Sequence, residues 1–313
     1  MPRLITEAPT DAIGLEELVA ELDAGVFDPK DEDAFAAWGP ALKRLANNRD
    51  FLADVMLAEL KQRCHEQLRG NQYGAPVIML HRADNYFIRA NLWPAEADSV
   101  VRQSGIDPFF YNVPHDHNFS FLTVGYLGPG YWSDYYEYEY DQVTGYLGEE
   151  VDLRFVERSR LELGKVMLYR AHKDVHLQLP ADALSVSLNI VETSPCTAFR
   201  DQYRFDLAAG TVAGIMTRTS LEPLLLLAAH HGGGNGTDLL DDFALRHPSD
   251  RVRWAALKAL AGTADDLDAR IATFERGTSD RSPLVAQMAQ ATIAKLEQSR
   301  AWIEAAPQME AAA

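Results

Sequence analysis

The segment between residues 76 and 195 limits most strongly what this chain can fold into. It is rich in Val, Ile, Tyr, Phe and Thr, and Gly and Pro interrupt it at short intervals. These residue types favour strands, and the interruptions are typical of the turns between them. Short strands at this spacing predict an antiparallel sandwich or barrel rather than alternating strands and helices. We expect strands at 77–80, 85–93, 120–126, 134–140, 153–156, 165–170, 176–179 and 185–192.

Helical patterns flank the strand-rich segment. On the N-terminal side, Thr10 and Asp11 can cap a helix with apolar residues at helical spacing, and similar patterns cover 31–47 and 50–68. Helical patterns resume after residue 208. We therefore predict an α+β fold in which a small antiparallel β-barrel is flanked by helices. Its parts are an N-terminal helical segment (1–70) packed on the barrel, the barrel (71–207), and an all-α segment (208–313).

The C-terminal segment shows a weak internal repeat. Ser249 or Asp250 can cap a helix with an apolar stripe in residues 247–260, and residues 278–289 follow the same plan. This pattern resembles HEAT-type helical repeats, which usually bind proteins or extended peptides. The glycine-rich residues 232–236 lack the Lys-Ser/Thr of a phosphate-binding loop, so we interpret them as a flexible linker.

Charge and composition exclude several classes of protein. The 313 residues include 29 Lys and Arg but 46 Asp and Glu, which gives a formal charge of −17. Such a balance argues against nucleic acid or an anionic membrane as the partner, since both require a basic surface. The apolar run 224–229 is too short to span a bilayer. Two distant cysteines and the absence of a signal-peptide pattern predict a cytoplasmic protein without a disulfide framework.

The sharpest chemical feature is the string Pro114-His115-Asp116-His117 at the entry to a predicted strand. Residues i and i+2 of a strand point to the same side, so His115 and His117 can direct both imidazoles at one metal ion. Asp116 points the other way and is a poor ligand. An exposed or core pair of histidines would show the same spacing, but a further histidine about 60 residues on favours metal binding.

The third ligand has two kinds of candidate. His176 opens a predicted strand and is preferred over His172, which lies in a polar turn. Alternatively, the strand 134–140 folds back through the Gly-Pro-Gly turn onto the histidine strand and brings Glu137 close. Two histidines and a carboxylate would suit Fe(II), whereas three histidines suit Fe, Zn, Cu or Ni.

Residues 86–203 resemble a cupin, and within the cupins most closely the cysteine dioxygenase type. Cupins carry His-x-His and then a Glu in a first motif, and another His in a second. His115 and His117 match the first pair, two apolar residues stand in place of the Glu, and His176 matches the last His. Thiol dioxygenases also lack that Glu. The resemblance therefore implies a double-stranded β-helix that binds Fe(II) through three histidines.

The resemblance also implies residues that contact the substrate. In thiol dioxygenases an Arg on an earlier strand holds the substrate carboxylate, and Arg89 lies at a similar spacing before the first His. Asn189 and Val191 occupy the positions of the family's outer His and catalytic Tyr. A substrate other than cysteine is therefore implied. Tyr135, from another predicted strand, is our candidate for the missing phenol, and the neighbouring Tyr136 and Tyr138 are alternatives.

These features support three functional hypotheses. The first is a metal-dependent oxygenase, with Fe(II) preferred over Zn, Mn, Ni or Cu, that oxidises a small amine-, thiol- or carboxylate-bearing substrate or a peptide side chain. The second is a non-oxygenase metal cupin such as an isomerase or lyase. The third is a metal- or ligand-sensing protein that binds a protein partner through its C-terminal helices. The metal that the protein carries separates the first hypothesis from the second.

Overall fold

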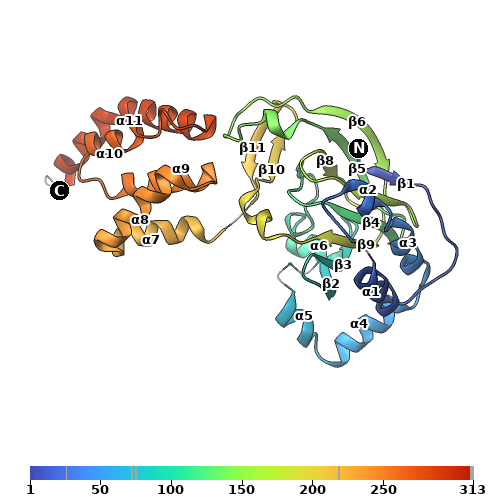
Figure 1. Cartoon of the computed structure of the whole chain (residues 1–313). Helices are drawn as coiled ribbons and strands as arrows, with labels where there is room; N and C mark the ends of the chain where they lie inside the picture. Colours follow the sequence, from blue (N-terminus) through green and yellow to red (C-terminus); the bar gives the residue numbers. More distant parts are fainter. Residues whose placement is uncertain (26, 72, 75, 218, 311–313) are drawn as a thin grey trace. The chain divides into compact units, whose positions relative to one another are not determined.

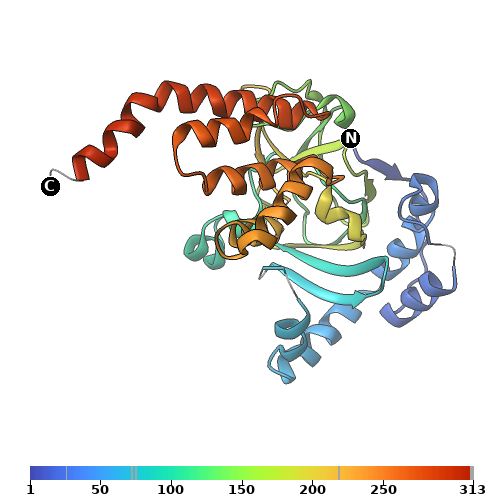
Figure 2. The same ribbon diagram turned by 60° about the vertical axis from the view of Figure 1, so that its left-hand side comes forward.

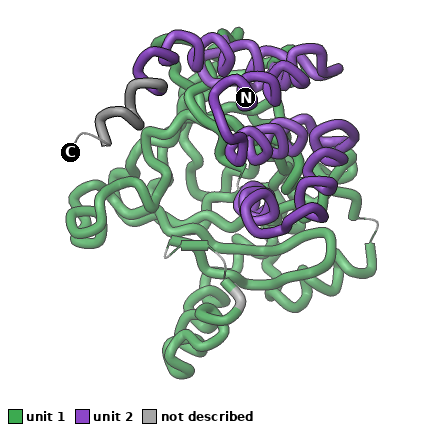
Figure 3. The backbone as a smooth tube through the Cα atoms, turned by 90° about the vertical axis from the view of Figure 1, so that its left-hand side faces the viewer, with its two compact units in different colours: residues 1–143, 150–217 green, residues 144–149, 218–313 purple. Residues whose placement is uncertain are grey.

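The computed structural model describes residues 1–25, 27–71, 73–74, 76–217 and 219–310. The chain divides into two compact units, one formed by residues 1–143 and 150–217 and the other by residues 144–149 and 218–313 (Figure 3). The predicted α+β class, with antiparallel strands and a helical C-terminal region, is confirmed. None of the described helices combines the length and the apolar character needed to cross a bilayer.

The first unit contains a large antiparallel sheet with the strand order β1-β7-β4-β9-β3-β2. Its strands are β1 (Arg3–Ile5), β2 (Val77–Arg82), β3 (Tyr86–Trp93), β4 (Phe121–Leu127), β7 (Val166–Tyr169) and β9 (Ser185–Glu192). The central strands β3, β4 and β9 are almost entirely buried, and β3 and β9 bury the polar residues Arg89, Asn91 and Asn189 as well as apolar ones. Figure 2 shows the β2–β3 hairpin at the edge of this sheet.

The remaining strands of this unit form two smaller ladders. One has the order β6-β5-β8, and the other pairs β10 with β11. These strands are β5 (Trp132–Glu137), β6 (Arg154–Arg160), β8 (Asp174–Gln178), β10 (Tyr203–Asp206) and β11 (Thr211–Ile215). An extended segment around His115 pairs with β8 on one side and with β10 on the other. Closure of these ladders into the predicted barrel remains a prediction.

Both faces of the large sheet are covered. On β3, Ile88 and Ala90 face the N-terminal helices, where they share a core with Leu18 and Leu42. Helix α3 packs over β4, β7 and β9 (Figure 1). The helices are α1 (Leu15–Ala24), α2 (Glu32–Ala36), α3 (Gly39–Asn47), α4 (Phe51–Lys61), α5 (His65–Gly70) and α6 (Ser99–Ser104). The opposite face of the sheet carries Phe87, Trp93, Phe121 and Tyr169, which form a second, aromatic-rich core with Tyr135 of β5.

The predicted fold-back of residues 134–140 onto the histidine strand is wrong. Strand β5 pairs with β6 and β8, whereas β4 lies in the large sheet. The turn between them crosses from one sheet to the other and leaves no room for side chains. Gly128 and Gly130 have φ values of +78° and +82°, and a Cβ on Gly130 would lie 1.9 Å from the Leu161 carbonyl oxygen.

Boundaries of several predicted elements also differ. Helix α1 begins at Leu15, and Asp11 accepts a hydrogen bond from Arg44 (2.7 Å) instead of capping the helix. The predicted helices 31–47 and 50–68 are each broken in two. The helical C-terminal region begins at Leu221 rather than at the predicted residue 208, because β11 continues to Ile215. Strands of only four or five residues, such as β10 and β11, give little signal in a sequence.

The second unit consists of α7 (Leu221–His231), α8 (Gly233–Arg246), α9 (Asp250–Gly262), α10 (Leu267–Glu275) and α11 (Pro283–Glu310) (Figure 1). The Ser249 hydroxyl caps α9 by accepting from Val252 N, as predicted. The interpretation of residues 232–236 as a linker is wrong, because Gly233 begins α8. A Cβ on Gly236 would lie 2.2 Å from the Ala228 carbonyl oxygen, so these glycines allow α7 and α8 to meet closely. The HEAT-like repeat remains a prediction.

We expect Gly130→Ala to destabilise the protein severely. Both Gly130 and Gly148 have a left-handed φ, of +82° and +84°, but only Gly130 is enclosed by backbone atoms. Gly148→Ala should therefore cost about 1–2 kcal/mol from backbone conformation alone, whereas Gly130→Ala should cost several kcal/mol more or prevent folding. Urea unfolding of the two variants measures the difference, and equal stabilities would contradict this account of the turn.

Candidate metal centre

Three histidines converge between the large sheet and the β6-β5-β8 ladder. His115 N donates to His176 O (3.1 Å), and His176 N donates to His115 O (2.9 Å), so these residues form a directly opposed antiparallel pair. Opposed residues present their side chains on the same face. His117, two residues on, presents its ring to the same point. The His-x-His segment lies just before β4, rather than within a regular strand, but its extended backbone keeps the predicted alternation.

The ring nitrogens lie close enough to share one ion. His176 Nε2 is 3.0 Å from His117 Nε2 and 3.2 Å from His115 Nε2. The three donor atoms lie within 4.8 Å of one another. All three side chains are buried, with 2–8% of their surface exposed. Nitrogen atoms at these separations must share a proton or a cation, because bare lone pairs repel.

The surroundings of the rings set their tautomers. His115 Nδ1 lies 2.7 Å from the Val113 carbonyl oxygen, so Nδ1 carries the proton and Nε2 offers a lone pair. The nearest partner of His117 Nδ1 is Gln202 Nε2, at 3.5 Å. His176 Nδ1 is buried and has no hydrogen-bond partner in the described part of the chain. The donor set, three imidazole Nε2 atoms facing a common centre, fits a divalent transition metal.

Electrostatics keep the rings in the form that binds metals. Burial lowers the pKa of His115 to about 4. Burial, with the neighbouring His115, lowers the pKa of His176 well below its usual value, and the pKa of His117 falls for the same reasons. All three imidazoles are therefore neutral near pH 7, as metal ligation requires.

Asp116 lies on the opposite side of the segment, as predicted, and has a structural role. Its carboxylate accepts hydrogen bonds from the Tyr138 hydroxyl and from Tyr203 N, both at 2.6 Å. Burial raises the pKa of Asp116 to about 7 despite these bonds. Asp116 thus ties the histidine segment to β10 on the side away from the rings.

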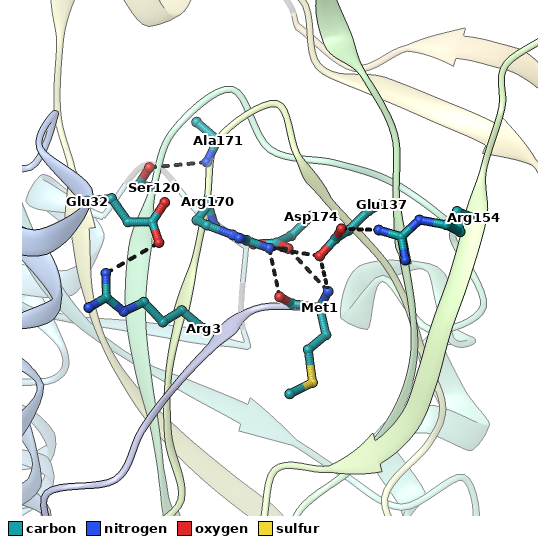
Figure 4. Close-up of polar contacts among 9 residues, drawn as sticks. All are labelled: Met1, Arg3, Glu32, Ser120, Glu137, Arg154, Arg170, Ala171 and Asp174. Atoms are coloured by element: carbon teal, nitrogen blue, oxygen red, sulfur yellow. Dashed lines mark hydrogen bonds and ion pairs between the residues drawn. The ribbon is translucent and has the colours of Figure 1, made fainter.

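The alternative ligands lie elsewhere. The His172 ring stacks on Tyr140 with centroids 3.8 Å apart, and its Nε2 lies 3.2 Å from the Asp201 carbonyl oxygen. Glu137 accepts hydrogen bonds from the Met1 amino group (2.6 Å) and Arg170 (3.1 Å) (Figure 4). These cations hold the pKa of Glu137 at about 2, although burial acts to raise it. Within the described residues, the histidine group contains no carboxylate.

Beside the histidines lies a cavity of about 270 Å³. Most of its wall is apolar and largely aromatic, and polar side chains are confined to a few positions. Aromatic side chains come from Tyr73, Trp93, Phe109, Phe110, Phe119, Phe121 and Tyr131. Polar side chains besides the histidines come from Arg89, Asn91, Gln178, Asn189 and Gln202. A concave, mostly apolar space with few polar groups is typical of a small-molecule site.

Arg89 lies in the cavity wall on β3. Its guanidinium carbon is 4.9 Å from the centroid of the Tyr73 ring and 5.8 Å from that of Phe87. No carboxylate forms an ion pair with Arg89 in the described part of the chain, and its Nε has no hydrogen-bond partner there. Burial lowers the pKa of Arg89. A buried guanidinium without a carboxylate partner is costly, so its position favours an anionic ligand.

The structure places the predicted phenol away from the cavity. Tyr135 is fully buried, and its hydroxyl lies 2.9 Å from that of Tyr169. Tyr131, five residues after the end of the predicted strand 120–126, lines the cavity instead and packs on Trp93 with centroids 4.5 Å apart. Sequence reasoning missed Tyr131 because it follows the Gly-Pro-Gly turn and belongs to no periodic segment. The cavity-facing Asn91 and Asn189 were also not predicted to act together.

Comparisons with known proteins give distant structural likeness only. No family model matches the chain, and no curated protein matches it. A cupin domain from Bordetella pertussis Tohama I is 13% identical, with 40% of this chain and 98% of that chain covered and a TM-score of 0.23. The DMSP lyase DddQ from Ruegeria pomeroyi DSS-3 is 13% identical, with 62% and 78% covered and a TM-score of 0.24.

A third similar structure is an oxygenase. A salicylate 1,2-dioxygenase from Pseudaminobacter salicylatoxidans is 10% identical, with 53% of this chain and 38% of that chain covered and a TM-score of 0.28. The similar structures thus include a cupin domain, a lyase and a dioxygenase. At such identities and scores the likeness carries no conclusion about this chain's chemistry, which must come from its own side chains.

The buried histidines should make the metal-free protein sensitive to acid. Unfolded histidine binds a proton near pH 6.5, whereas the folded pKa of His115 is about 4 and that of His117 lies well below its usual value. Protons therefore favour the unfolded chain, and the free energy of unfolding decreases as the pH falls from 6.5 to about 4. His117→Gln should reduce the slope of the free energy of unfolding against pH by up to about 1.4 kcal/mol per pH unit.

Urea unfolding at several pH values between about 4 and 6.5 measures this slope. His65→Gln is the matched control, because His65 is exposed at the start of α5, and it should leave the slope unchanged. The same slope in wild type and His117→Gln would contradict the proposed burial of a neutral ring.

Proposed function

We propose that this chain is a metal-dependent enzyme of the cupin type in which His115, His117 and His176 bind one divalent transition metal. The convergence of three neutral, buried Nε2 atoms supports this proposal most directly. Fe(II) is the metal we expect, and Zn, Mn, Ni or Cu would also accept imidazole ligands. The absence of a carboxylate from the described histidine group favours the three-histidine version over the two-histidine-one-carboxylate version.

The side chains around the proposed metal centre would bind the metal, bind the substrate or exclude water. His115, His117 and His176 would hold the metal, with the proton of His115 Nδ1 fixed on the Val113 carbonyl. Arg89 would bind a carboxylate of the substrate by paired hydrogen bonds, which orients the substrate in the cavity. The aromatic wall would exclude water from the reacting end. When bound, a metal with three protein ligands and open positions supplies Lewis-acid or, for Fe(II), oxygen-activating chemistry.

We infer further that the reaction is an oxygenation of a small substrate. Three neutral ligands with no added carboxylate, together with the resemblance of the motif to thiol dioxygenases, support this class. Tyr131 and Tyr73 would take the place of Tyr135 as phenols near the substrate, since both line the cavity and Tyr135 is not among its lining residues. An isomerase or lyase would use the same pocket with a metal that does not activate oxygen.

Replacement of a proposed ligand should empty the metal site. We expect His176→Ala and His117→Ala each to lose bound metal, because two remaining imidazoles hold a divalent ion weakly. His172→Ala should leave metal content nearly unchanged, since its ring stacks on Tyr140 outside the group. Mass spectrometric metal analysis of the purified variants decides this, and equal loss in His172→Ala would overturn the ligand assignment.

Glu137→Gln tests the carboxylate alternative directly. The substitution keeps the shape of the side chain and removes its charge, while its ion pairs with Arg170 and Met1 lie away from the histidines. We expect metal affinity to stay within a few-fold of wild type. A collapse of affinity would restore Glu137 as a ligand.

Metal content and oxygen uptake together test the function. Protein purified without added metal should carry iron, and it should consume O₂ when small carboxylates bearing an amine, thiol or hydroxyl group are supplied. An oxygen electrode and elemental analysis on the same preparation give both quantities. Stoichiometric Zn, Mn or Ni with no oxygen uptake would favour an isomerase or lyase, and failure to bind any metal would refute the metal centre.

A further inference from the structure

The cavity wall formed by β3 and β9 carries polar groups whose hydrogen-bonding capacity is unused. Arg89 and Asn189 are directly opposed across the two strands, and Asn91 lies two residues after Arg89 on the same face. All three line the cavity and are at least nine-tenths buried, with exposed fractions of 8%, 2% and 9%. Arg89 Nε and the Oδ1 atoms of Asn91 and Asn189 have no hydrogen-bond partner among the described residues.

These unpaired atoms differ in kind. A guanidinium only donates, so Arg89 Nε requires an acceptor, whereas an amide oxygen requires a donor. The Asn189 amide is oriented by the hydrogen bond that its Nδ2 donates to Thr123 Oγ1 (2.7 Å), which leaves Oδ1 as the free atom. Buried polar groups without partners are costly and few in folded proteins. Three of them on one cavity wall indicate a ligand with an acidic group and a donor close together.

The size and the apolar wall of the rest of the cavity indicate the character of the remainder of that ligand. Trp93 and Tyr131 pack against each other, and Phe109, Phe119 and Phe121 add further ring surface. A space of about 270 Å³ lies at the small end of the range for ligand cavities. Aromatic side chains accommodate flat apolar groups through offset or edge contacts. The ligand body is therefore apolar and about the size of one ring.

We propose that the substrate is a small carboxylic acid with a hydroxyl or amino group next to the carboxylate and an aromatic or similarly apolar body. Arg89 binds the carboxylate, and the Oδ1 atoms of Asn91 and Asn189 accept hydrogen bonds from the neighbouring donor. The two asparagines determine specificity, since an acid without the donor leaves both oxygens unpaired. This inference rests on the proposed function, whose substrate it defines.

Three matched ligands test the inference by calorimetric titration. 3-Phenylpropionate has the carboxylate and the ring, and 3-phenyllactate and phenylalanine add a hydroxyl or an amine beside the carboxylate. We expect at least one of the last two to bind about tenfold more tightly than 3-phenylpropionate, as one or two buried hydrogen bonds would provide. Equal affinities for all three, or no binding at millimolar concentration, would overturn the proposal.

Variants identify the groups responsible. The preference is the ratio of the affinities for the donor-bearing acid and for 3-phenylpropionate. Asn91→Leu should lower this ratio at least about threefold, because one buried hydrogen bond is lost. The double variant Asn91→Leu/Asn189→Leu should abolish the preference. Asn85 is exposed in the turn between β2 and β3, so Asn85→Leu is the matched control and should leave the ratio of the affinities for the donor-bearing acid and 3-phenylpropionate unchanged. If the double variant does not fold, Asn91→Leu alone decides, and an unchanged preference overturns the proposal.

The same samples separate this inference from the proposed function. Each titration is run on protein of measured metal content, before and after treatment with a chelator. A preference for the donor-bearing acid in protein that binds no metal would refute the metal centre but leave the substrate class standing. Metal at full occupancy with equal affinities for the acids would refute the substrate class and leave the metal centre intact.

Discussion

The candidate site depends on one pair of reciprocal backbone hydrogen bonds, between His115 and His176. These bonds join residues that are 61 positions apart and place them directly opposite each other, so both rings must leave the sheet on the same face. His117 joins them because extended backbone alternates with a period of two. On the other side, Asp116 fastens the same segment to Tyr203 and Tyr138. Hydrogen bonds on both sides therefore fix the backbone of this segment, and its two histidine rings converge with that of His176 on one face.

The two sheets contribute different chemistry to the cavity. The histidines come from β8 and the segment beside it, whereas Arg89, Asn91 and Asn189 come from β3 and β9 of the large sheet. Both groups line one cavity, and the charge of Arg89 is among the causes that lower the pKa of His117. Burial has opposite consequences for the two groups. It keeps the imidazoles uncharged, which suits ligation, and it leaves the guanidinium in need of an anion.

Local periodicity accounts for what the sequence predicted, and long-range topology accounts for what it missed. The strands 85–93 and 185–192 could be recognised from composition, and the spacing of His115 and His117 predicted rings on one side. The fold-back that would bring Glu137 close was wrong, because no local pattern shows that the Gly-Pro-Gly turn crosses between sheets. Tyr131 was missed because it lies outside any periodic segment. Asn189 was noted only at the position of the family's outer His, and Asn91 was not noted at all. The register of β3 and β9 places Asn189 opposite Arg89 and brings these residues to one cavity wall.

The separation of the two chemical groups across two sheets has an evolutionary consequence. The histidines and the guanidinium are carried by different strand ladders, and side chains of the aromatic-rich core pack between them. Changes in the size of core residues such as Met167 and Leu161, which are not among the residues that line the cavity, would alter the distance between the two groups. Substitutions in the core could thus adapt such a protein to longer or shorter substrates, while the histidines and the arginine stay the same.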